Sequence, residues 1–506
     1  MLDSTERHAV SDRPAEMPVE MPRRVLMIAS EALPFAKTGG LADVLGALPV
    51  ALSRLGWDVT VALPRYRGVT TGSLVEQFPM TLGGYTRDVG FYDVAVTERT
   101  RALLVDCPDL YDREELYGAG GADYPDNALR FAMLVRGALE FIARRGAVPT
   151  IVHAHDWQAG LAPVYLKTLY AAHPVLGGTP SVFTIHNLAY QGLFDAGWLP
   201  RLDLPPELFT MERLEYWGRI SFLKGGINDS DVVTTVSPTY AREIQTPAFG
   251  FGFDGILRKR SADLFGILNG IDTAEWDPAH DRFLSGPYDL NDLAGKTAAK
   301  AELLARYRLP TDDAAMERPV IGIISRMVDQ KGFDLIAAVT DTLLQLDAAF
   351  VVLGSGETRY QDMWSRLALG YPSQIGARIG FDEALAHLIE GGADMFLMPS
   401  RFEPCGLNQM YSLRYGTVPI VRAVGGLADT VTDYAPGRPD STGFVFQDYT
   451  PAALLGAVAR ALALYPDHRR WRALQVAGMQ QDHSWDRSAR EYVTIYERAQ
   501  RVRAKA

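Results

Sequence analysis

Residues 319–336 read PVIGIISRMVDQKGFDLI, and this stretch decides the fold class. An apolar run rich in Ile leads into a polar turn, which holds Arg326 and Lys331, and an amphipathic run follows. A continuous apolar run is typical of a strand buried on both faces, as in a parallel sheet. The order of strand, loop and helix predicts doubly wound α/β structure.

The same unit recurs along the chain, in two groups. It is found in RVLMIASEALPFAKTGG (24–40), TIVHAHDWQAG (150–160), SVFTIHNLAYQG (181–192), DVVTTVSPTYAREI (231–244), AFVVLGSGE (349–357) and DMFLMPSRFEPCGL (394–407). We therefore predict two α/β domains, residues 24–265 and 266–480. A stretch rich in Gly, Pro, Asp and Asn at 266–296 is the predicted hinge.

Length and charge limit the class of protein. A chain of 506 residues exceeds one ordinary core, so two or three domains are expected. The net charge of −11 argues against a general nucleic-acid or anionic-membrane surface. The sequence contains no run of 18 apolar residues, so no membrane span is predicted. The only cysteines, Cys107 and Cys405, fit a reducing compartment rather than a disulfide scaffold.

The two ends of the chain differ in pattern. Residues 1–23 are polar and contain Pro, without the apolar core of a signal peptide, so a flexible arm is expected. Residues 481–506 predict a helix, because Trp485, Ala489, Tyr492 and Tyr496 fall on one helical face.

The pentapeptide GGLAD occurs twice, at 39–43 and at 425–429. In each copy two glycines precede a helical pattern. Glycine lets the backbone approach a ligand closely, and a helix start presents free N–H groups. One interpretation is that the copies face one cleft from opposite sides, and the other is that both are ordinary glycine turns.

Charged side chains follow several of the apolar runs. Ligands of doubly wound sheets bind beyond the carboxyl ends of the strands. Arg326 and Lys331 suit a diphosphate, unless they are a solvated basic pair. Glu403 precedes Cys405 and Gly406, so its carboxylate suits sugar hydroxyls and the following N–H groups suit phosphate. The alternative for Glu403 is a helix cap.

Histidines raise a separate question. His153, His155 and Asp156 could hold a metal, since residues i and i+2 share one strand face. No further His/Asp cluster has a zinc-hydrolase spacing, so we predict no metal and no cofactor. His186 follows a strand. A hydrogen-bonded structural histidine is the default interpretation, and the place at the carboxyl end of the strand adds weight to a functional role.

In their order along the chain, the motifs resemble those of bacterial glycogen synthases and plant starch synthases. They are SEALPFAKTGGLADVLGALP, HAHDWQAG, FTIHNLAYQG, SRMVDQKG and SRFEPCGL…YGT…GGLADT, and they cover the chain from about Arg24 to the C-terminus. The resemblance implies the glycosyltransferase-B fold, with two Rossmann-like domains facing a deep cleft and the last helix packing back on the N-terminal domain. It also implies a cytoplasmic enzyme that transfers glucose from ADP-glucose to the non-reducing 4-OH of an α-1,4-glucan such as glycogen, with retention and without a metal.

The same resemblance assigns site residues. The catalytic ones are His186, near the glucose 6-OH, Arg326 and Lys331, which neutralise the diphosphate, and Glu403, which positions sugar hydroxyls. The substrate-binding ones are Glu31, Lys37, Gly39, Gly40, Asp156, Asn187, Asn269, Cys405, Gly406, Leu407, Gly426 and Thr430.

Some alternatives stay open from the sequence. A related retaining transferase would use UDP-glucose or another acceptor, and a silent glucan-binding protein would have lost activity. Intact Lys37, His186, Arg326, Lys331 and Glu403 argue against the silent protein. Asn408 and Met410 stand where the family pattern has Thr and Leu. The sequence does not give the oligomeric state.

Overall fold

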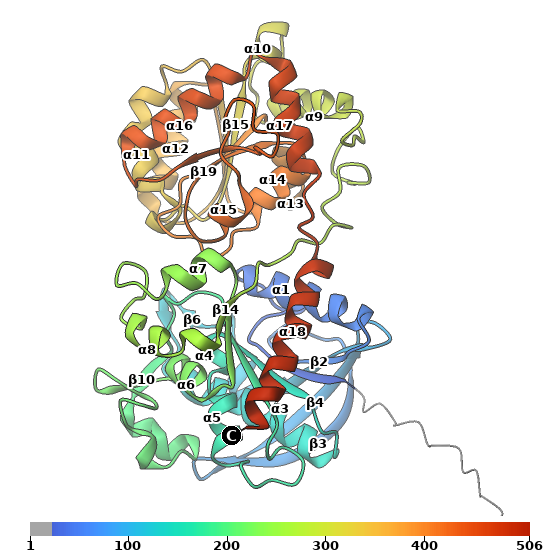
Figure 1. Cartoon of the computed structure of the whole chain (residues 1–506), viewed down its shortest axis with the longest axis vertical. Coiled ribbons are helices and arrows are strands. Elements are labelled where there is room, and N and C mark those ends of the chain that lie inside the picture. The colour runs from blue at the N-terminus through green and yellow to red at the C-terminus, as the bar shows by residue number, and fades with distance from the viewer. Residues whose placement is uncertain (1–22, 506) are drawn as a thin grey trace, which may run out of the picture.

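Two α/β domains stack along the long axis of the molecule (Figure 1). The structure is a computed structural model that describes residues 23–505. The arm expected for residues 1–23 therefore lies outside the described residues, except for Arg23. The predicted fold class, two doubly wound α/β domains, is confirmed.

The N-terminal domain is built on one large sheet. Its strand order is β14-β13-β9-β8-β1-β2-β5-β4-β3; the strands from β14 to β5 run parallel, and β4 and β3 extend the β5 edge antiparallel. The central strands are buried along their length, which explains their continuous apolar runs. The bounds are β14 Leu264–Gly266, β13 Val232–Thr235, β9 Ser181–Ile185, β8 Ile151–His155, β1 Arg24–Ile28, β2 Asp58–Pro64, β5 Thr100–Asp106, β4 Tyr85–Ala95 and β3 Ser73–Leu82.

The C-terminal domain carries a wholly parallel sheet. Its order is β17-β16-β15-β18-β19-β20, which is the Rossmann order 3-2-1-4-5-6. The parallel part of the first sheet follows the same order and adds a seventh strand, β14, beside β13. The bounds are β17 Ile375–Ile379, β16 Ala349–Gly354, β15 Val320–Ile324, β18 Met395–Met398, β19 Val418–Arg422 and β20 Phe444–Phe446.

Helices connect the parallel strands, as the strand–loop–helix pattern predicts. In the N-terminal domain they are α1 Gly40–Arg54, α2 Pro108–Tyr111, α3 Asn127–Arg144, α4 Asp156–Ala159, α5 Leu161–Lys167, α6 Phe222–Asp229, α7 Pro238–Glu243 and α8 Asp254–Lys259. In the C-terminal domain they are α9 Ala294–Arg306, α10 Asp313–Glu317, α11 Phe333–Leu343, α12 Thr358–Gly370, α13 Glu383–Gly392, α14 Asn408–Arg414, α15 Gly425–Thr430, α16 Pro451–Leu464 and α17 His468–Met479. The N-terminal domain also has two small sheets. One consists of β10 Leu193–Asp195, β12 Arg219–Ser221 and β11 Glu215–Tyr216, and the other of β6 Gly118–Ala119 and β7 Ala122–Asp123.

The last helix, α18 (Trp485–Arg503), returns to the N-terminal domain and runs down its side, in red in Figure 1. It packs on α1, and its buried face carries Trp485, Ala489, Tyr492 and Tyr496. The Tyr496 ring meets Trp57 edge-on at 5.2 Å between centroids. The chain therefore crosses between the domains twice, once before and once after the C-terminal domain in the sequence.

The first crossing is an extended linker. Residues 267–293 hold no helix, and their one bridge pairing joins Ile271 to Ser484, just before α18. The two crossing segments thus lie side by side. No helix between residues 23 and 505 combines the length and the apolar composition that a membrane span needs.

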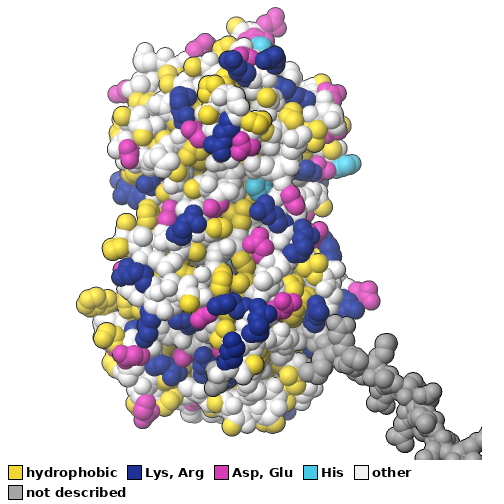
Figure 2. Space-filling model, in the orientation of Figure 1, with side chains coloured by type: hydrophobic (Ala, Val, Ile, Leu, Met, Phe, Trp, Pro, Cys, Tyr) yellow, Lys and Arg dark blue, Asp and Glu magenta, His cyan; other side chains and the backbone are white. Residues whose placement is uncertain are grey.

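Charged side chains of both signs are interspersed on the face shown in Figure 2. Two ion pairs join α18 to the N-terminal domain. Arg54 of α1 contacts Asp486 at 2.7 Å, and Arg498 contacts Asp263 at 2.8 Å. Both pairs are partly exposed, so the apolar face of α18 contributes more to docking than these ions do.

Candidate active site

A cavity of about 950 Å³ lies between the two domains. It sits beyond the carboxyl ends of the parallel strands, where doubly wound sheets bind ligands. Its size suits a ligand as large as a nucleotide sugar. Its lining includes every predicted site residue except Gly426 and Thr430.

The first GGLAD copy forms one wall of the cavity, and Glu31 holds it in place. Glu31 follows β1 and is buried, and its carboxylate accepts hydrogen bonds from Thr38 N at 2.5 Å, Thr38 Oγ1 at 2.6 Å and Gly39 N at 3.2 Å. The hydroxyl of Tyr117 donates to the same carboxylate. Glu31 therefore acts on the loop that faces the cavity.

The glycines of this copy leave the wall open. A Cβ built at Gly39 would meet nothing within 4 Å, and one at Gly40 would only touch Leu407 of the other domain at 4.0 Å. Lys37 reaches Asp43, the last residue of the copy, at 2.6 Å, and its side chain remains 45% exposed. The Lys37 ammonium group and the backbone of the two glycines thus line the same cavity.

Asp156 and His186 form the floor on the N-terminal side. Asp156 follows β8 with a left-handed φ of 56°, a conformation that is costly outside glycine and recurs at functional sites. Its Oδ1 accepts the backbone N–H of His186 at 2.7 Å and of Asn187 at 3.4 Å. Burial raises the pKa of Asp156 to about 7 and lowers the pKa of His186 to about 3. His186 is therefore a neutral imidazole at neutral pH.

The histidines of HAHDW have structural partners. The ring nitrogens of His153 lie 2.9 Å from the Tyr496 hydroxyl and 2.7 Å from the Thr184 hydroxyl. His155 Nδ1 lies 3.0 Å from His186 Nε2. Both nitrogens of His153 are engaged, so this ring has no free ligand atom for a metal.

The predicted cations and carboxylate of the C-terminal domain meet at the ends of β15 and β18. Lys331 Nζ lies 2.6 Å from Glu403 Oε2, which also accepts from Ser400 Oγ at 3.0 Å. Glu403 is 5% exposed. The exposed Arg326 guanidinium makes no ion pair within residues 23–505. The pair and the free guanidinium face the loop that Glu31 holds.

Residues 405–407 continue this wall into α14. Gly406 has a φ of 74°, and a Cβ there would lie 2.5 Å from Gln409 Oε1, so this turn requires glycine. Burial raises the pKa of the Cys405 thiol to about 12, so the thiol stays protonated. Asn269 is buried beside it and lines the cavity. Asn408, the departure from the family pattern, donates its side-chain amide to the Ile324 carbonyl at 2.8 Å.

The second GGLAD copy is placed differently. It lies beneath residues 403–405, where a Cβ at Gly426 would come within 2.1 Å of the Cys405 carbonyl. Thr430 is buried and donates to Gly426 O at 2.6 Å. The structure does not bring Gly426 and Thr430 to the cavity, so the interpretation that both copies face the cleft holds for the first copy alone. Their role in substrate binding stays a prediction.

The second copy instead binds the N-terminal domain. Asp429 accepts from Thr239 N at 2.8 Å and Thr239 Oγ1 at 2.7 Å, and Gly425 N donates to both Glu243 oxygens at 3.1 Å. Ser237 Oγ donates to Pro404 O at 2.6 Å. Sequence reasoning missed these α7 contacts, and it missed Tyr117 and Ser400, because no local pattern marks a partner that only folding brings near.

Two facing Rossmann-type domains with cations and a carboxylate in the cleft define the class of glycosyltransferases with the glycosyltransferase-B fold. Comparison with known proteins agrees. Residues 24–259 match the starch synthase catalytic domain, and residues 311–473 match glycosyl transferases group 1. At the level of fold, sucrose-phosphate synthase from Thermosynechococcus elongatus is similar, with a TM-score of 0.59 at 17% identity over 94% of this chain and 98% of that one.

Closer relatives narrow the class. The chain is 48% identical to a glycogen synthase of Koribacter versatilis over 483 residues, 95% of this chain and 99% of the relative. It is 50% identical to one of Anaeromyxobacter dehalogenans, over 94% and 98%. The catalytic domain of starch synthase IV from Arabidopsis thaliana, bound to ADP and acarbose, superposes with a TM-score of 0.86 at 34% identity, over 95% of this chain and all of that one. The chain belongs to the glycogen and starch synthase family.

Proposed function

We propose that this protein is a glycogen synthase that transfers glucose from ADP-glucose to the non-reducing 4-OH of an α-1,4-glucan, with retention, and releases ADP. The observation that carries the proposal is the Lys331–Glu403 pair beside Arg326 in the interdomain cavity. Similarity to the starch synthase domain bound to ADP and acarbose supports the choice of donor and acceptor.

Arg326 and Lys331 take the charge of the leaving group in this proposal. Breaking the bond between C1 and the diphosphate oxygen builds negative charge on ADP, which fixed cations stabilise in a site shielded from water. An ammonium group has three donors, so Lys331 can keep its bond to Glu403 and still donate to phosphate. The Arg326 guanidinium, without an ion-pair partner among residues 23–505, offers a planar fork to phosphate oxygens.

Glu403 and His186 orient the sugar. The Glu403 carboxylate accepts sugar hydroxyls, and the neutral His186 ring bonds a hydroxyl without competing with the cations for phosphate. The acceptor 4-OH attacks C1 on the face that ADP leaves. A C1–O4 bond forms, the C1–phosphate bond breaks, and the hydroxyl proton passes to the departing phosphate oxygen.

The experiment that tests this proposal is glucose incorporation into glycogen by the purified chain, with ADP-glucose and UDP-glucose in parallel. Incorporation from ADP-glucose is expected. Preference for UDP-glucose would overturn the donor assignment, and no incorporation from either would overturn the proposal.

The Lys331→Ala variant tests the role of the cation. We expect a loss of about 10²- to 10³-fold in kcat/KM, the size found when one stabilising group is removed from a transition state. Glycogen binding should persist. Lys259→Ala, which changes an exposed lysine of α8, is the matched control. Unchanged kcat/KM in Lys331→Ala would remove Lys331 from the mechanism.

The division of labour along the chain belongs to the same proposal. We assign residues 24–265 to the acceptor side, residues 266–480 to nucleotide-sugar binding, and residues 481–506 to a helix that completes the N-terminal domain. The two separate sheets and the docking of α18 on α1 support this division. A cytoplasmic location is part of the proposal as well, since both cysteines are free thiols.

A further inference from the structure

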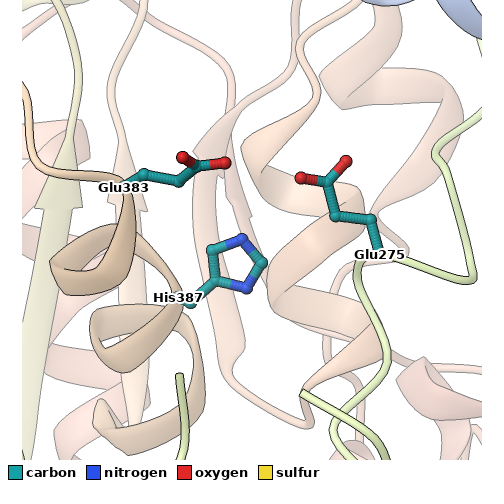
Figure 3. A group of neighbouring side chains, drawn as sticks. All are labelled: Glu275, Glu383 and His387. Carbon is teal, nitrogen blue, oxygen red and sulfur yellow. The ribbon is translucent and has the colours of Figure 1, made fainter. Parts of the chain in front are cut away.

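Three potential metal ligands meet outside the cavity, at the junction of the linker and the C-terminal domain. Glu275 comes from the linker, and Glu383 and His387 stand one turn apart on α13. One ligand atom from each lies within 4.8 Å of the others. Figure 3 shows the two carboxylates on either side of the imidazole ring. None of the three residues lines the interdomain cavity.

A hydrogen bond at Nδ1, the ring nitrogen nearer the main chain, fixes the orientation of His387. Its Nδ1 lies 2.7 Å from Asp281 Oδ2, and that oxygen also accepts from the Tyr415 hydroxyl at 2.5 Å. A carboxylate accepts hydrogen bonds, so Nδ1 donates to Asp281, and the tautomer that this bond selects has its lone pair on Nε2. The ring is 1% exposed and stacks on Trp276 with 3.8 Å between centroids.

The lone pair of His387 Nε2 has no protein partner. The atom is buried and makes no hydrogen bond within residues 23–505. In Figure 3 the ring nitrogen farther from the main chain points toward the gap between Glu275 and Glu383. Buried polar atoms without a partner are rare and costly. Here the lone pair meets two carboxylates, which are themselves acceptors, so a cation is the chemical complement of all three groups.

We propose that Glu275, Glu383 and His387 bind a divalent transition metal ion of the Zn²⁺ type. An imidazole nitrogen with two carboxylate oxygens suits Zn²⁺ and its neighbours better than Mg²⁺ or Ca²⁺, which take oxygen ligands. A carboxylate behind the ligating imidazole is the usual support of such histidines, and Asp281 supplies it. Three protein ligands leave room for water in the fourth position.

A metal at this site would link the interdomain linker to α13. Trp276, next to Glu275 in the chain, stacks on His387 and also on Tyr411 of α14 at 3.8 Å. Helix α14 follows Leu407, which lines the cavity. The ion would therefore hold one of the two crossing segments against the domain that carries Lys331 and Glu403.

Metal binding by the full chain, without nucleotide, tests this proposal. After chelator treatment, Zn²⁺ is titrated by calorimetry and Co²⁺ by visible absorption, and thermal unfolding is followed with and without Zn²⁺. We expect one tight Zn²⁺ per chain, a Co²⁺ spectrum that Zn²⁺ displaces, and a higher Tm with Zn²⁺. No binding of either ion would overturn the proposal.

Substitutions of the two exposed carboxylates locate the ion. Glu275→Gln and Glu383→Gln keep the side-chain shape and should weaken Zn²⁺ binding at least tenfold each, with unchanged Tm in the absence of metal. Glu207→Gln, at an exposed glutamate of the N-terminal domain, is the matched control and should bind as the wild type does. Equal affinity in the wild type and in a Glu275→Gln/Glu383→Gln double variant would place the ion elsewhere and overturn the site. Turnover enters none of these measurements, so the result stands apart from that of the incorporation assay.

Discussion

The two GGLAD copies have the same five residues and opposite surroundings. The copy at 39–43 begins α1 with its glycines open to the cavity. The copy at 425–429 forms α15, with its glycines pressed against the backbone of residues 403–405. Glycine serves ligand approach in the first case and backbone approach in the second.

A glutamate holds each copy from outside. Glu31 accepts from Thr38 N and Gly39 N in front of the first copy, and Glu243 accepts from Gly425 N in the second. Glu31 belongs to the same domain as its copy, whereas Glu243 belongs to the opposite domain. The first contact shapes a loop of the cavity, and the second joins two domains, so similar hydrogen bonds have different consequences.

Alanine at the first glycine of each copy should produce the largest difference between the copies, a difference in the free energy of unfolding. Gly425 has a φ of 44°, and a Cβ there would lie 1.8 Å from Glu403 O. Gly425→Ala should lower the free energy of unfolding by about 2–5 kcal/mol, from left-handed strain and overpacking together. Gly39→Ala, with a φ of −153° and nothing within 4 Å, should change it by less than about 1 kcal/mol. Urea unfolding of both variants measures this, and equal losses would contradict the contrast.

Glutamine at each glutamate should separate activity from domain contact. Glu31→Gln leaves one acceptor oxygen for the donors that the carboxylate now holds, the N–H groups of Thr38 and Gly39 and the hydroxyls of Thr38 and Tyr117. We expect kcat/KM to fall about ten- to a hundredfold, because the loop loses its position. Glu243→Gln should leave kcat/KM within about threefold and lower stability instead. Steady-state kinetics beside urea unfolding decides, and a loss of activity confined to Glu243→Gln would reverse the assignment.

Acid should lower the folding stability of the N-terminal domain, which carries the first copy. Burial lowers the pKa of His153 and His186 from 6.5 to about 3 and puts the pKa of His155 well below 6.5. Below pH 6.5 the unfolded chain takes up these protons and the folded chain does not. His153 and His186 therefore each remove about 1.4 kcal/mol of stability per pH unit as pH falls from 6.5 toward 3, and His155 acts in the same direction. Asp156, with its pKa raised from 3.8 to about 7, acts in the opposite sense and offsets one of the three.

Urea unfolding at pH 7.5 and 5.5 measures this loss. His153→Gln should make the pH dependence shallower by about one proton. His280→Gln is the control, since the His280 side chain is 82% exposed. The same pH dependence in both variants would show that His153 is not one of the groups responsible.

The aspartates of the two copies should give the smallest effect. Asp429→Ala removes two exposed hydrogen bonds to Thr239 and should cost about 0.5–1 kcal/mol. Asp43→Ala frees Lys37 and should change the KM for ADP-glucose more than it changes stability. Thr239→Ala keeps the backbone N–H of residue 239, so a double-mutant cycle isolates the bond between Thr239 Oγ1 and Asp429 Oδ1, and a coupling energy of zero would show that this bond contributes nothing.

Much of the fold could be predicted from the sequence, for a physical reason. Strands buried on both faces leave continuous apolar runs, and the residues that follow them meet at one edge of the sheet. Arg326, Lys331, Glu403 and His186 were found in that way, and all of them line the cavity. The strand order of each sheet left no such trace, because it depends on pairing between distant segments.

The sequence could not predict contacts between residues that are far apart along the chain. Tyr117 binds Glu31 across 86 positions, and Tyr496 of the last helix fills the neighbourhood of His153. The burial of the second GGLAD copy follows from the approach of residues 403–405, which the pentapeptide itself does not encode.

The return of α18 to the N-terminal domain has a consequence for the order of synthesis. The apolar cluster beneath α1 is shared with Trp485, Tyr492 and Tyr496. These residues leave the ribosome after the whole C-terminal domain, so the domain that begins to fold first is completed only after the second has been synthesised. A chain cut short anywhere before Trp485 would expose that apolar surface, which marks an incomplete product for the proteases and chaperones that recognise unfolded chains.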